Sequence, residues 1–146
     1  MKISVIGTGY VGLVSGACLA ERGHQVTCVD IRPEVVSEIN AGRPPIHEVG
    51  LEDLLLAARD KGRLSATTDA KPAILDSDVT LICVGTPTVD GRMDMSQIVA
   101  AAKEVGAALV NKRGYHVVAV KSTVLPGTTE GPVKAAIESE SGRRVG

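Results

Sequence analysis

Aromatic residues are nearly absent from this sequence: tyrosine occurs twice, and phenylalanine and tryptophan do not occur. The core must therefore consist of Val, Ile, Leu and Ala, a composition typical of parallel strands that are buried on both faces. A surplus of charge is also lacking, since 16 Lys and Arg stand against 17 Asp and Glu. Without a basic surface we expect neither nucleic acid nor a membrane as a partner.

Cysteine is scarce as well. Cys18, Cys28 and Cys83 each lie in an apolar run, and no two of them form a C-x-x-C pair. We expect three small buried side chains in a reducing compartment, without a disulfide or a metal site. No run of about 18 apolar residues is present to span a membrane, and residues 1–29 do not have the layout of a signal peptide. These absences predict a cytoplasmic protein.

Short apolar segments alternate with amphipathic ones along the whole chain. The segments that resemble strands are 2–6, 25–29, 64–68, 78–84 and 116–122. The segments that resemble helices are 10–22, 33–40, 51–61, 70–76, 95–110 and 126–139. We expect a turn at Asp90-Gly91, and Asp94 with Gln97 to form a capping box. The alternation predicts an α/β fold of the Rossmann type, with a doubly wound parallel sheet, in one domain over residues 1–146.

The first 30 residues contain the strongest functional pattern. Gly7, Gly9 and Gly12 have the spacing G-x-G-x-x-G directly after the first strand, and the second strand ends at Asp30, 18 residues after Gly12. In dinucleotide sites the first glycine allows the tight turn, the second admits the pyrophosphate and the third allows close packing of the helix on the sheet. The amino end of that helix attracts phosphate. We therefore expect a dinucleotide site; glycines that serve packing alone are the alternative.

Asp30 also bears on the choice of cofactor. Its carboxylate can accept the two ribose hydroxyls of adenosine and would repel a 2′-phosphate, so NAD is expected over NADP. Arg32 stands two residues further on and could in principle soften this preference, but an arginine that binds a 2′-phosphate more often replaces the acidic residue.

Four further motifs accompany the glycine loop. They are PIHEVGLEDLL (45–55), GRLSATTD (62–69), ICVGTP (82–87) and KSTVLPGTT (121–129). As a set, in this order and spacing, they resemble the amino-terminal NAD-binding domain of the UDP-glucose/GDP-mannose dehydrogenase family. The resemblance implies a protein that oxidises the C6 hydroxyl of a nucleotide sugar to a carboxylate with two NAD⁺. The residues of the motifs are slightly more similar to the GDP-mannose branch of the family.

The resemblance also implies roles for individual residues. Backbone amides of Tyr10 and Val11 would lie along the pyrophosphate, and Asp30 would hold the adenosine ribose. Thr86 and Thr123 follow the fourth and fifth strands. Since ligands of open parallel sheets bind at the carboxyl ends of the strands, we expect both threonines on the same rim as the glycine loop. Capping or turn formation beside a proline is the alternative role for each threonine.

Two positions depart from the family pattern. Val35 stands where the family often has a basic residue that reaches the adenosine ribose, and Arg32 is the candidate to replace it. Val49 stands where the family usually has proline. A site role for the neighbouring Glu48 is therefore no better supported than an ordinary surface carboxylate.

The catalytic groups of the family are expected outside this chain. The second oxidation needs a cysteine nucleophile, and the three cysteines present occur in the wrong segments. The lone histidines, His24, His47 and His116, suggest no catalytic set. We thus expect a domain that binds NAD without turnover and lacks a sixth strand, the sugar-nucleotide domain and the helix that pairs subunits into a homodimer. An exposed fifth strand would then favour self-association.

Two alternatives stay open. One is the cofactor domain of a β-hydroxyacid or 6-phosphogluconate dehydrogenase, which would share the glycine loop but not the later motifs. The other is a stand-alone NAD-binding regulatory module, which the absence of catalytic groups does not exclude.

Overall fold

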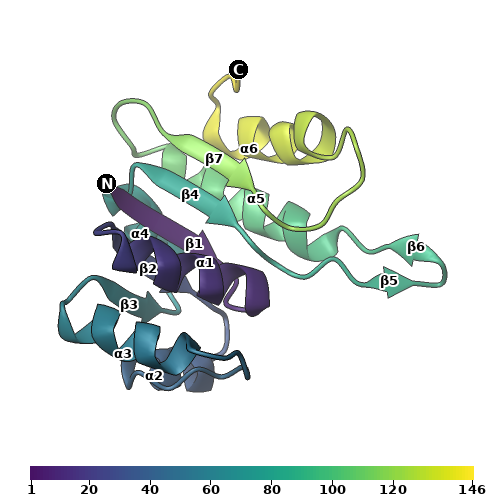
Figure 1. Ribbon diagram of the computed structural model, residues 1–146. Coiled ribbons are helices and arrows are strands. Elements are labelled where there is room, and N and C mark those ends of the chain that lie inside the picture. The colour runs from purple at the N-terminus through teal and green to yellow at the C-terminus, as the bar shows by residue number, and fades with distance from the viewer.

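A five-stranded parallel sheet forms the centre of the protein. The computed structural model describes residues 1–146 and is shown in Figure 1. The strands are β1 (Lys2–Ile6), β2 (Gln25–Val29), β3 (Leu64–Thr67), β4 (Val79–Ile82) and β7 (Val117–Val120), in the order β3-β2-β1-β4-β7. All four pairings are parallel. The order runs outward in both directions from β1 and β4, so the doubly wound fold expected from the sequence is confirmed.

Helices cover both faces of this sheet (Figure 1). They are α1 (Tyr10–Glu21), α2 (Pro33–Asn40), α3 (Leu51–Asp60), α4 (Ala70–Asp76), α5 (Ser96–Leu109) and α6 (Lys134–Ser141). The side chains of β1 alternate between two cores: Val5 packs with α1, α2 and α3, whereas Ile6 packs with α4, α5 and α6. Both cores consist of aliphatic side chains, as the lack of aromatic residues predicts, and the core that contains Val5 also includes Cys28 and Cys83. No helix is both long enough and apolar enough to cross a membrane.

The last helix is the element that the sequence predicts least well. A helix was expected over 126–139, but a π-helical turn, η1 (Thr129–Val133), precedes α6. Pro132 lies inside this turn and has no amide hydrogen to donate. The amide of Val133 reaches back five residues to the carbonyl of Thr128, at 3.2 Å, which is the hydrogen bond of a π-helix.

A hairpin extends from the carboxyl side of β4 (Figure 1). Its strands, β5 (Thr88–Val89) and β6 (Arg92–Met93), are antiparallel and are joined by Asp90 and Gly91. Both of these residues have positive φ, 48° and 73°, as a tight two-residue hairpin turn requires. The predicted turn is confirmed, although its two short strands were not foreseen.

The outer edge of β3 is covered by a side chain. The amide of Asn40, at the end of α2, donates to the carbonyl of Ala66 and accepts from its amide, at 2.9 and 2.8 Å. This pair replaces the contacts of a further strand and leaves less of the edge open to another chain.

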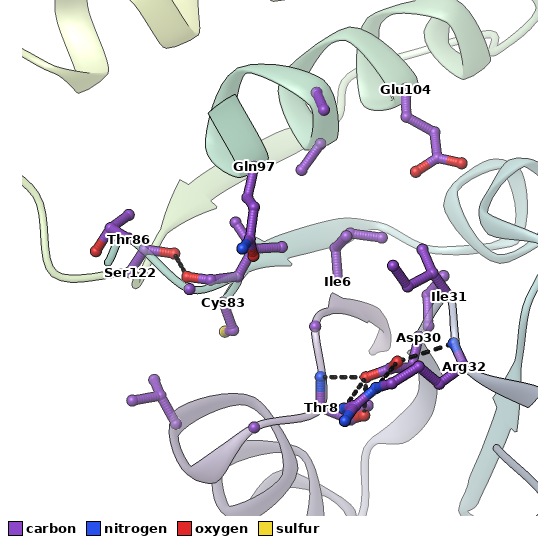
Figure 2. A pocket seen from close by; sticks show the side chains of 18 of the residues that line it. Ile6, Thr8, Asp30, Ile31, Arg32, Cys83, Thr86, Gln97, Glu104 and Ser122 are labelled. Atoms are coloured by element: carbon purple, nitrogen blue, oxygen red, sulfur yellow. Dashed lines mark hydrogen bonds and ion pairs between the residues drawn. The ribbon is translucent and has the colours of Figure 1, made fainter. Parts of the chain in front are cut away.

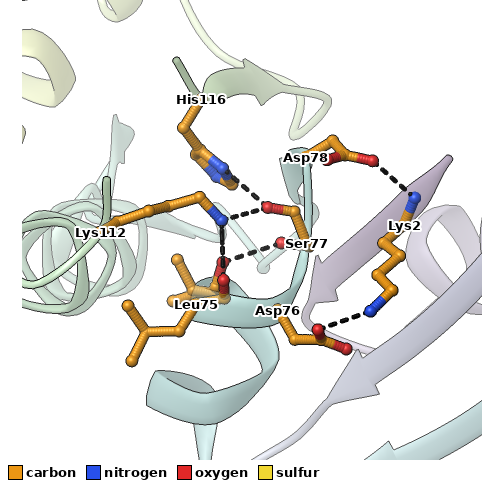
Figure 3. Close-up of polar contacts among 8 residues, drawn as sticks. Lys2, Leu75, Asp76, Ser77, Asp78, Lys112 and His116 are labelled. Atoms are coloured by element: carbon orange, nitrogen blue, oxygen red, sulfur yellow. Dashed lines mark hydrogen bonds and ion pairs between the residues drawn. The ribbon is translucent and has the colours of Figure 1, made fainter. Parts of the chain in front are cut away.

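A polar cluster lies at the amino ends of β1 and β4 (Figure 3). The ammonium group of Lys112 donates to the three carbonyls of Ile74, Leu75 and Ser77. His116 contacts the Ser77 carbonyl at 3.1 Å and the Thr80 hydroxyl at 2.8 Å, and its burial lowers its pKa. A cation at these carbonyls opposes the negative end of the α4 dipole. His116 therefore has the structural role that the sequence suggests.

Gly106 gives a test of the packing between α5 and α6. A Cβ at this position would lie 2.8 Å from the carbonyl oxygen of Ile137, which is backbone and cannot turn away. We expect Gly106→Ala to lower the free energy of unfolding by about 1–3 kcal/mol in urea melts. The control is Gly131→Ala, because its Cβ would meet no atom within 4 Å and its φ is not positive. Equal stability of the two variants would contradict the close approach.

Candidate cofactor site

A cavity of about 970 Å³ opens at the carboxyl ends of the strands (Figure 2). It lies where the strand order reverses between β1 and β4, which is the usual position of a ligand in a doubly wound sheet. The glycine loop and Asp30 line it, together with Thr86, Thr123 and part of α5. The structure therefore brings every residue of the predicted cofactor site to this cavity except Gly12, which packs behind it against Gly7.

Gly7 makes the turn out of β1. Its φ is +93°, and a Cβ there would lie 2.8 Å from the carbonyl oxygen of Cys83 in the neighbouring segment after β4. Its amide donates to the carbonyl of Val29, at 2.8 Å. Both the positive φ and the close contact favour glycine at this position.

Gly12 and Gly9 have different environments. A Cβ on Gly12 would overlap the carbonyl oxygen of Gly7, so the first turn of α1 is pressed against the turn that precedes it. A Cβ on Gly9 would meet no atom within 4 Å. Packing within the chain thus requires glycine at Gly12 and does not require it at Gly9. The open space above Gly9 is where a pyrophosphate would approach the backbone.

The amino end of α1 is open to a ligand at the same point. Gly9 is its N-cap residue, no side chain caps the helix, and no acidic residue lies in its first turn. The first amides of a helix have no partner within the helix. Those of Tyr10 and Val11 are consequently suited to bind an anion, assisted by the helix dipole.

Asp30 is held in a dense set of hydrogen bonds at the end of β2 (Figure 2). It is only 7% exposed. Its Oδ2 accepts from the hydroxyl and the amide of Thr8, the latter at 3.3 Å. Its Oδ1 accepts from the amide and Nε of Arg32, at 3.1 and 3.0 Å, and Nη2 of Arg32 reaches Oδ2 at 3.2 Å. The carboxylate is therefore fixed in position before any ribose meets it.

These contacts decide the protonation state of Asp30. Burial alone would raise the pKa of its carboxyl group, because it disfavours the charged form. The hydrogen bonds from Arg32 and Thr8, with the positive charge of Arg32, outweigh burial and lower the pKa to about 2. Asp30 is thus a carboxylate, an acceptor of hydroxyl protons, at any pH near neutrality.

Thr86 and Thr123 meet at the other side of the cavity. The hydroxyl of Thr86 donates to the carbonyl of Thr123, at 2.6 Å. The hydroxyl of the adjacent Ser122 donates to the carbonyl of Val84, at 2.7 Å. The segments that follow β4 and β7 are thereby tied together, and both threonines lie on the expected rim.

The sequence did not predict that α5 forms one wall of the cavity. This helix contributes Gln97, Ala100, Ala101 and Glu104 to the cavity. The predicted capping box is wrong in part: Asp94 accepts from the amide of Ser96, at 2.8 Å, but Gln97 lies against Gly85 instead of reaching back. The two adjacent alanines were a usable signal, since small side chains on one helical turn leave room for a flat group.

The cysteines do not provide a reactive group at the site. Burial raises the pKa of Cys28 to about 12 and that of Cys83 to about 11, so both stay protonated. The expectation that all three are buried is wrong for Cys18, which is exposed on the outer side of α1. No three His, Cys, Asp or Glu side chains come together as metal ligands.

The two departures from the family pattern have clear positions. Val35 is 5% exposed and belongs to the core between α2 and the sheet, so it makes no contribution to the cavity. Arg32 is the only basic residue that lines the cavity. Glu48 is exposed and does not line it, which favours the ordinary surface role.

Comparison with known proteins agrees with this site. Residues 1–146 match the UDP-glucose/GDP-mannose dehydrogenase family, NAD binding domain. The whole chain is 49% identical to a GDP-mannose 6-dehydrogenase of Pseudomonas aeruginosa and 46% identical to a UDP-glucose 6-dehydrogenase of Haloferax volcanii, and covers 34% of each. A crystal structure of a ternary complex of GDP-mannose dehydrogenase from P. aeruginosa superposes with a TM-score of 0.97 over 99% of this chain and 33% of that one. The chain thus spans about a third of the length of these relatives.

Because Gly9 and Gly12 have different environments, we expect a substitution at Gly9 to weaken NAD binding and a substitution at Gly12 to lower stability. We expect Gly9→Ala to keep the melting temperature within about 2 °C and to weaken NAD about tenfold or more in calorimetric titration, because its Cβ would occupy the space of the pyrophosphate. Gly12→Ala should unfold at a clearly lower temperature, since its Cβ would strike backbone. Gly9→Ala that binds NAD as well as the wild type would contradict the position assigned to the pyrophosphate.

The low pKa of Asp30 predicts a defined pH dependence of stability. The ordinary carboxyl value is 3.8 and the folded value about 2, so the charged form is favoured by folding. Its contribution is complete above pH 4 and is lost as the pH falls to 2. Asp30→Asn should therefore be less stable than the wild type in urea melts at pH 6, with the difference shrinking between pH 4 and 2. A difference that stays constant over this range would show that the carboxylate is not responsible.

Proposed function

Because the chain belongs to the UDP-glucose/GDP-mannose dehydrogenase family, we propose that it holds NAD in the cavity at the carboxyl ends of its strands. The pyrophosphate lies over Gly9 at the amides of Tyr10 and Val11, and Asp30 accepts the adenosine ribose hydroxyls. One observation carries this assignment: of the three loop glycines, Gly9 alone has open space above it, and that space faces the uncapped end of α1.

The positions of the adenine ring and of the nicotinamide half follow from this placement of the pyrophosphate and ribose. Ile31, whose side chain is 89% exposed, and the small alanines of α5 suit the flat adenine ring at one end. Thr86 and Thr123 lie at the other end and offer polar groups to the nicotinamide half. Arg32, paired with Asp30, is the basic residue at the adenosine end of the cavity.

NAD, when bound, supplies a hydride acceptor, and the residues of this chain orient it. The proposed overall reaction converts a sugar CH₂OH group, two NAD⁺ and water into a carboxylate, two NADH and three protons. It requires a nucleophile for the second oxidation. The only cysteine that lines the cavity is Cys83, and burial keeps its thiol protonated. This chain therefore binds and orients the oxidant, and we assign it no catalytic residue.

GDP-mannose is the preferred substrate of the whole protein in this proposal. The relative at 49% identity over the full chain is described as a GDP-mannose 6-dehydrogenase. UDP-glucose is the second candidate, because a UDP-glucose 6-dehydrogenase is 46% identical over the full chain. A regulatory module without chemistry is less well supported, since these relatives are dehydrogenases about three times as long as this chain.

We further propose a homodimer of the whole protein, working in the cytoplasm. The three cysteines are free thiols, which is typical of a reducing compartment. The homodimer rests on the resemblance to the family, whose subunits pair through a segment outside residues 1–146.

The proposal predicts binding and turnover in separate experiments. Purified residues 1–146 should bind NAD in calorimetric titration and should produce no NADH, measured at 340 nm, with GDP-mannose or UDP-glucose. NADH production by this chain alone would contradict the assignment of catalysis to other segments.

The substrate is tested with a protein that continues the chain to the length of its relatives. It should form two NADH per GDP-mannose and show a kcat/KM at least about tenfold lower with UDP-glucose. The reverse preference would move the protein to the UDP-glucose branch, and inactivity with both would favour the module.

A further inference from the structure

The guanidinium group of Arg32 covers the acceptor atoms that a ribose needs. It presents two N–H donors to Asp30, one to each carboxylate oxygen, at 3.0 and 3.2 Å. The two adjacent hydroxyls of a ribose present the same number of donors to a carboxylate. Arg32 thus makes with Asp30 the pair of contacts that the adenosine ribose would make, and the two cannot be present together.

The contacts divide into a fixed and an exchangeable set. Thr8, which is 1% exposed, and the backbone amide of Arg32 hold the carboxylate from the protein side. The Arg32 side chain is 54% exposed, whereas that of Asp30 is 7% exposed. Releasing the guanidinium group into water therefore leaves Asp30 in place and frees one acceptor position on each oxygen.

The released guanidinium group cannot go far. It is two residues from Asp30, and it is the only basic group that lines the cavity. The carboxylate of Glu34, at the start of α2, acts on its charge, and the cavity wall adds one further acidic side chain, Glu104. The charge of Arg32 consequently stays beside the ribose, at the hydroxyls that Asp30 reads.

We propose that Arg32 is exchanged for the ribose on Asp30 and then pairs with a phosphate on the ribose 2′ oxygen, so that this site also binds 2′-phosphorylated adenine nucleotides. This inference rests on the proposed position of the adenosine half at Asp30. Asp30 still favours NAD, since a carboxylate repels the added phosphate. Arg32 offsets part of that repulsion, because a guanidinium group pairs with phosphate through two hydrogen bonds.

The test compares 5′-ADP with 2′,5′-ADP, which differ only in the 2′-phosphate, by calorimetric titration against residues 1–146. For Arg32→Gln we expect 5′-ADP to bind as tightly as to the wild type or tighter, because the competing group is gone. We expect the ratio of the two dissociation constants, 2′,5′-ADP over 5′-ADP, to rise about tenfold.

The matched control is Arg22→Gln. Arg22 carries the same charge just beyond the far end of α1, about 18 Å along the helix from the site. The ratio of dissociation constants for Arg22→Gln should therefore stay within twofold of the wild-type ratio. Arg32→Lys keeps the charge but not the planar pair of N–H donors. Its ratio of dissociation constants should lie between those of the wild type and Arg32→Gln. Melting curves of all variants show that they are folded.

The outcomes distinguish an Arg32 that yields to the ribose and binds the 2′-phosphate from an Arg32 that does not. A rise of the ratio by fivefold or more in Arg32→Gln supports the proposal, and a smaller rise overturns it. A loss of 5′-ADP affinity by more than threefold also overturns it, because Arg32 would then hold the ribose instead of yielding to it. Failure of 5′-ADP to bind the wild type would refute the NAD site itself.

Discussion

The close approach of α1 to the turn after β1 is the constraint on which the site depends. Gly12 lies against the carbonyl of Gly7, and Gly7 lies against the carbonyl of Cys83. Side chains at either position would push the helix away from the two central strands. Because these contacts fix the end of α1, they also fix the direction of its free amides and the depth of the cavity in front of them. Backbone packing thus places the free amides that make this point suited to an anion.

The two ends of the sheet differ in how their polar backbone groups are satisfied. At the carboxyl ends of β1 and β4 the cavity lining includes three glycines, Gly7, Gly9 and Gly85, and the buried carboxylate of Asp30. At the amino ends Lys112 and His116 fill the corresponding position and satisfy the carbonyls that end α4. The carbonyls that end α4 thus have partners within the chain, whereas the first amides of α1 are left for a ligand.

The order of strands and helices and most of the site were predictable from the sequence, because both depend on local signals. The periodicity of apolar residues and the turn residues between them define β1, α1 and β2. The spacing of the glycines and Asp30 is set by this strand-helix-strand unit. What the sequence does not show depends on contacts between distant segments. The turn of Gln97 toward Gly85 and the exposure of Cys18 are set by how α5 and α1 lie on the sheet. The π-turn at Pro132 depends on how the chain continues its hydrogen bonds around a missing donor.

Asp30 shows how a rigid site can still admit its ligand. A buried carboxylate without partners would be costly, and it would take up a proton. Thr8 and Arg32 prevent this, and they differ in accessibility: Thr8 is enclosed by protein, whereas the guanidinium group of Arg32 reaches water. A ribose that replaces the guanidinium group exchanges two hydrogen bonds for two, and the displaced cation regains hydration. The carboxylate itself does not move in this exchange, because Thr8 and the backbone amide of Arg32 still hold it. Affinity at this end then reflects the difference between two sets of donors, and any group that binds Arg32 once it is displaced, such as a phosphate on the same ribose, shifts that difference in favour of the ligand.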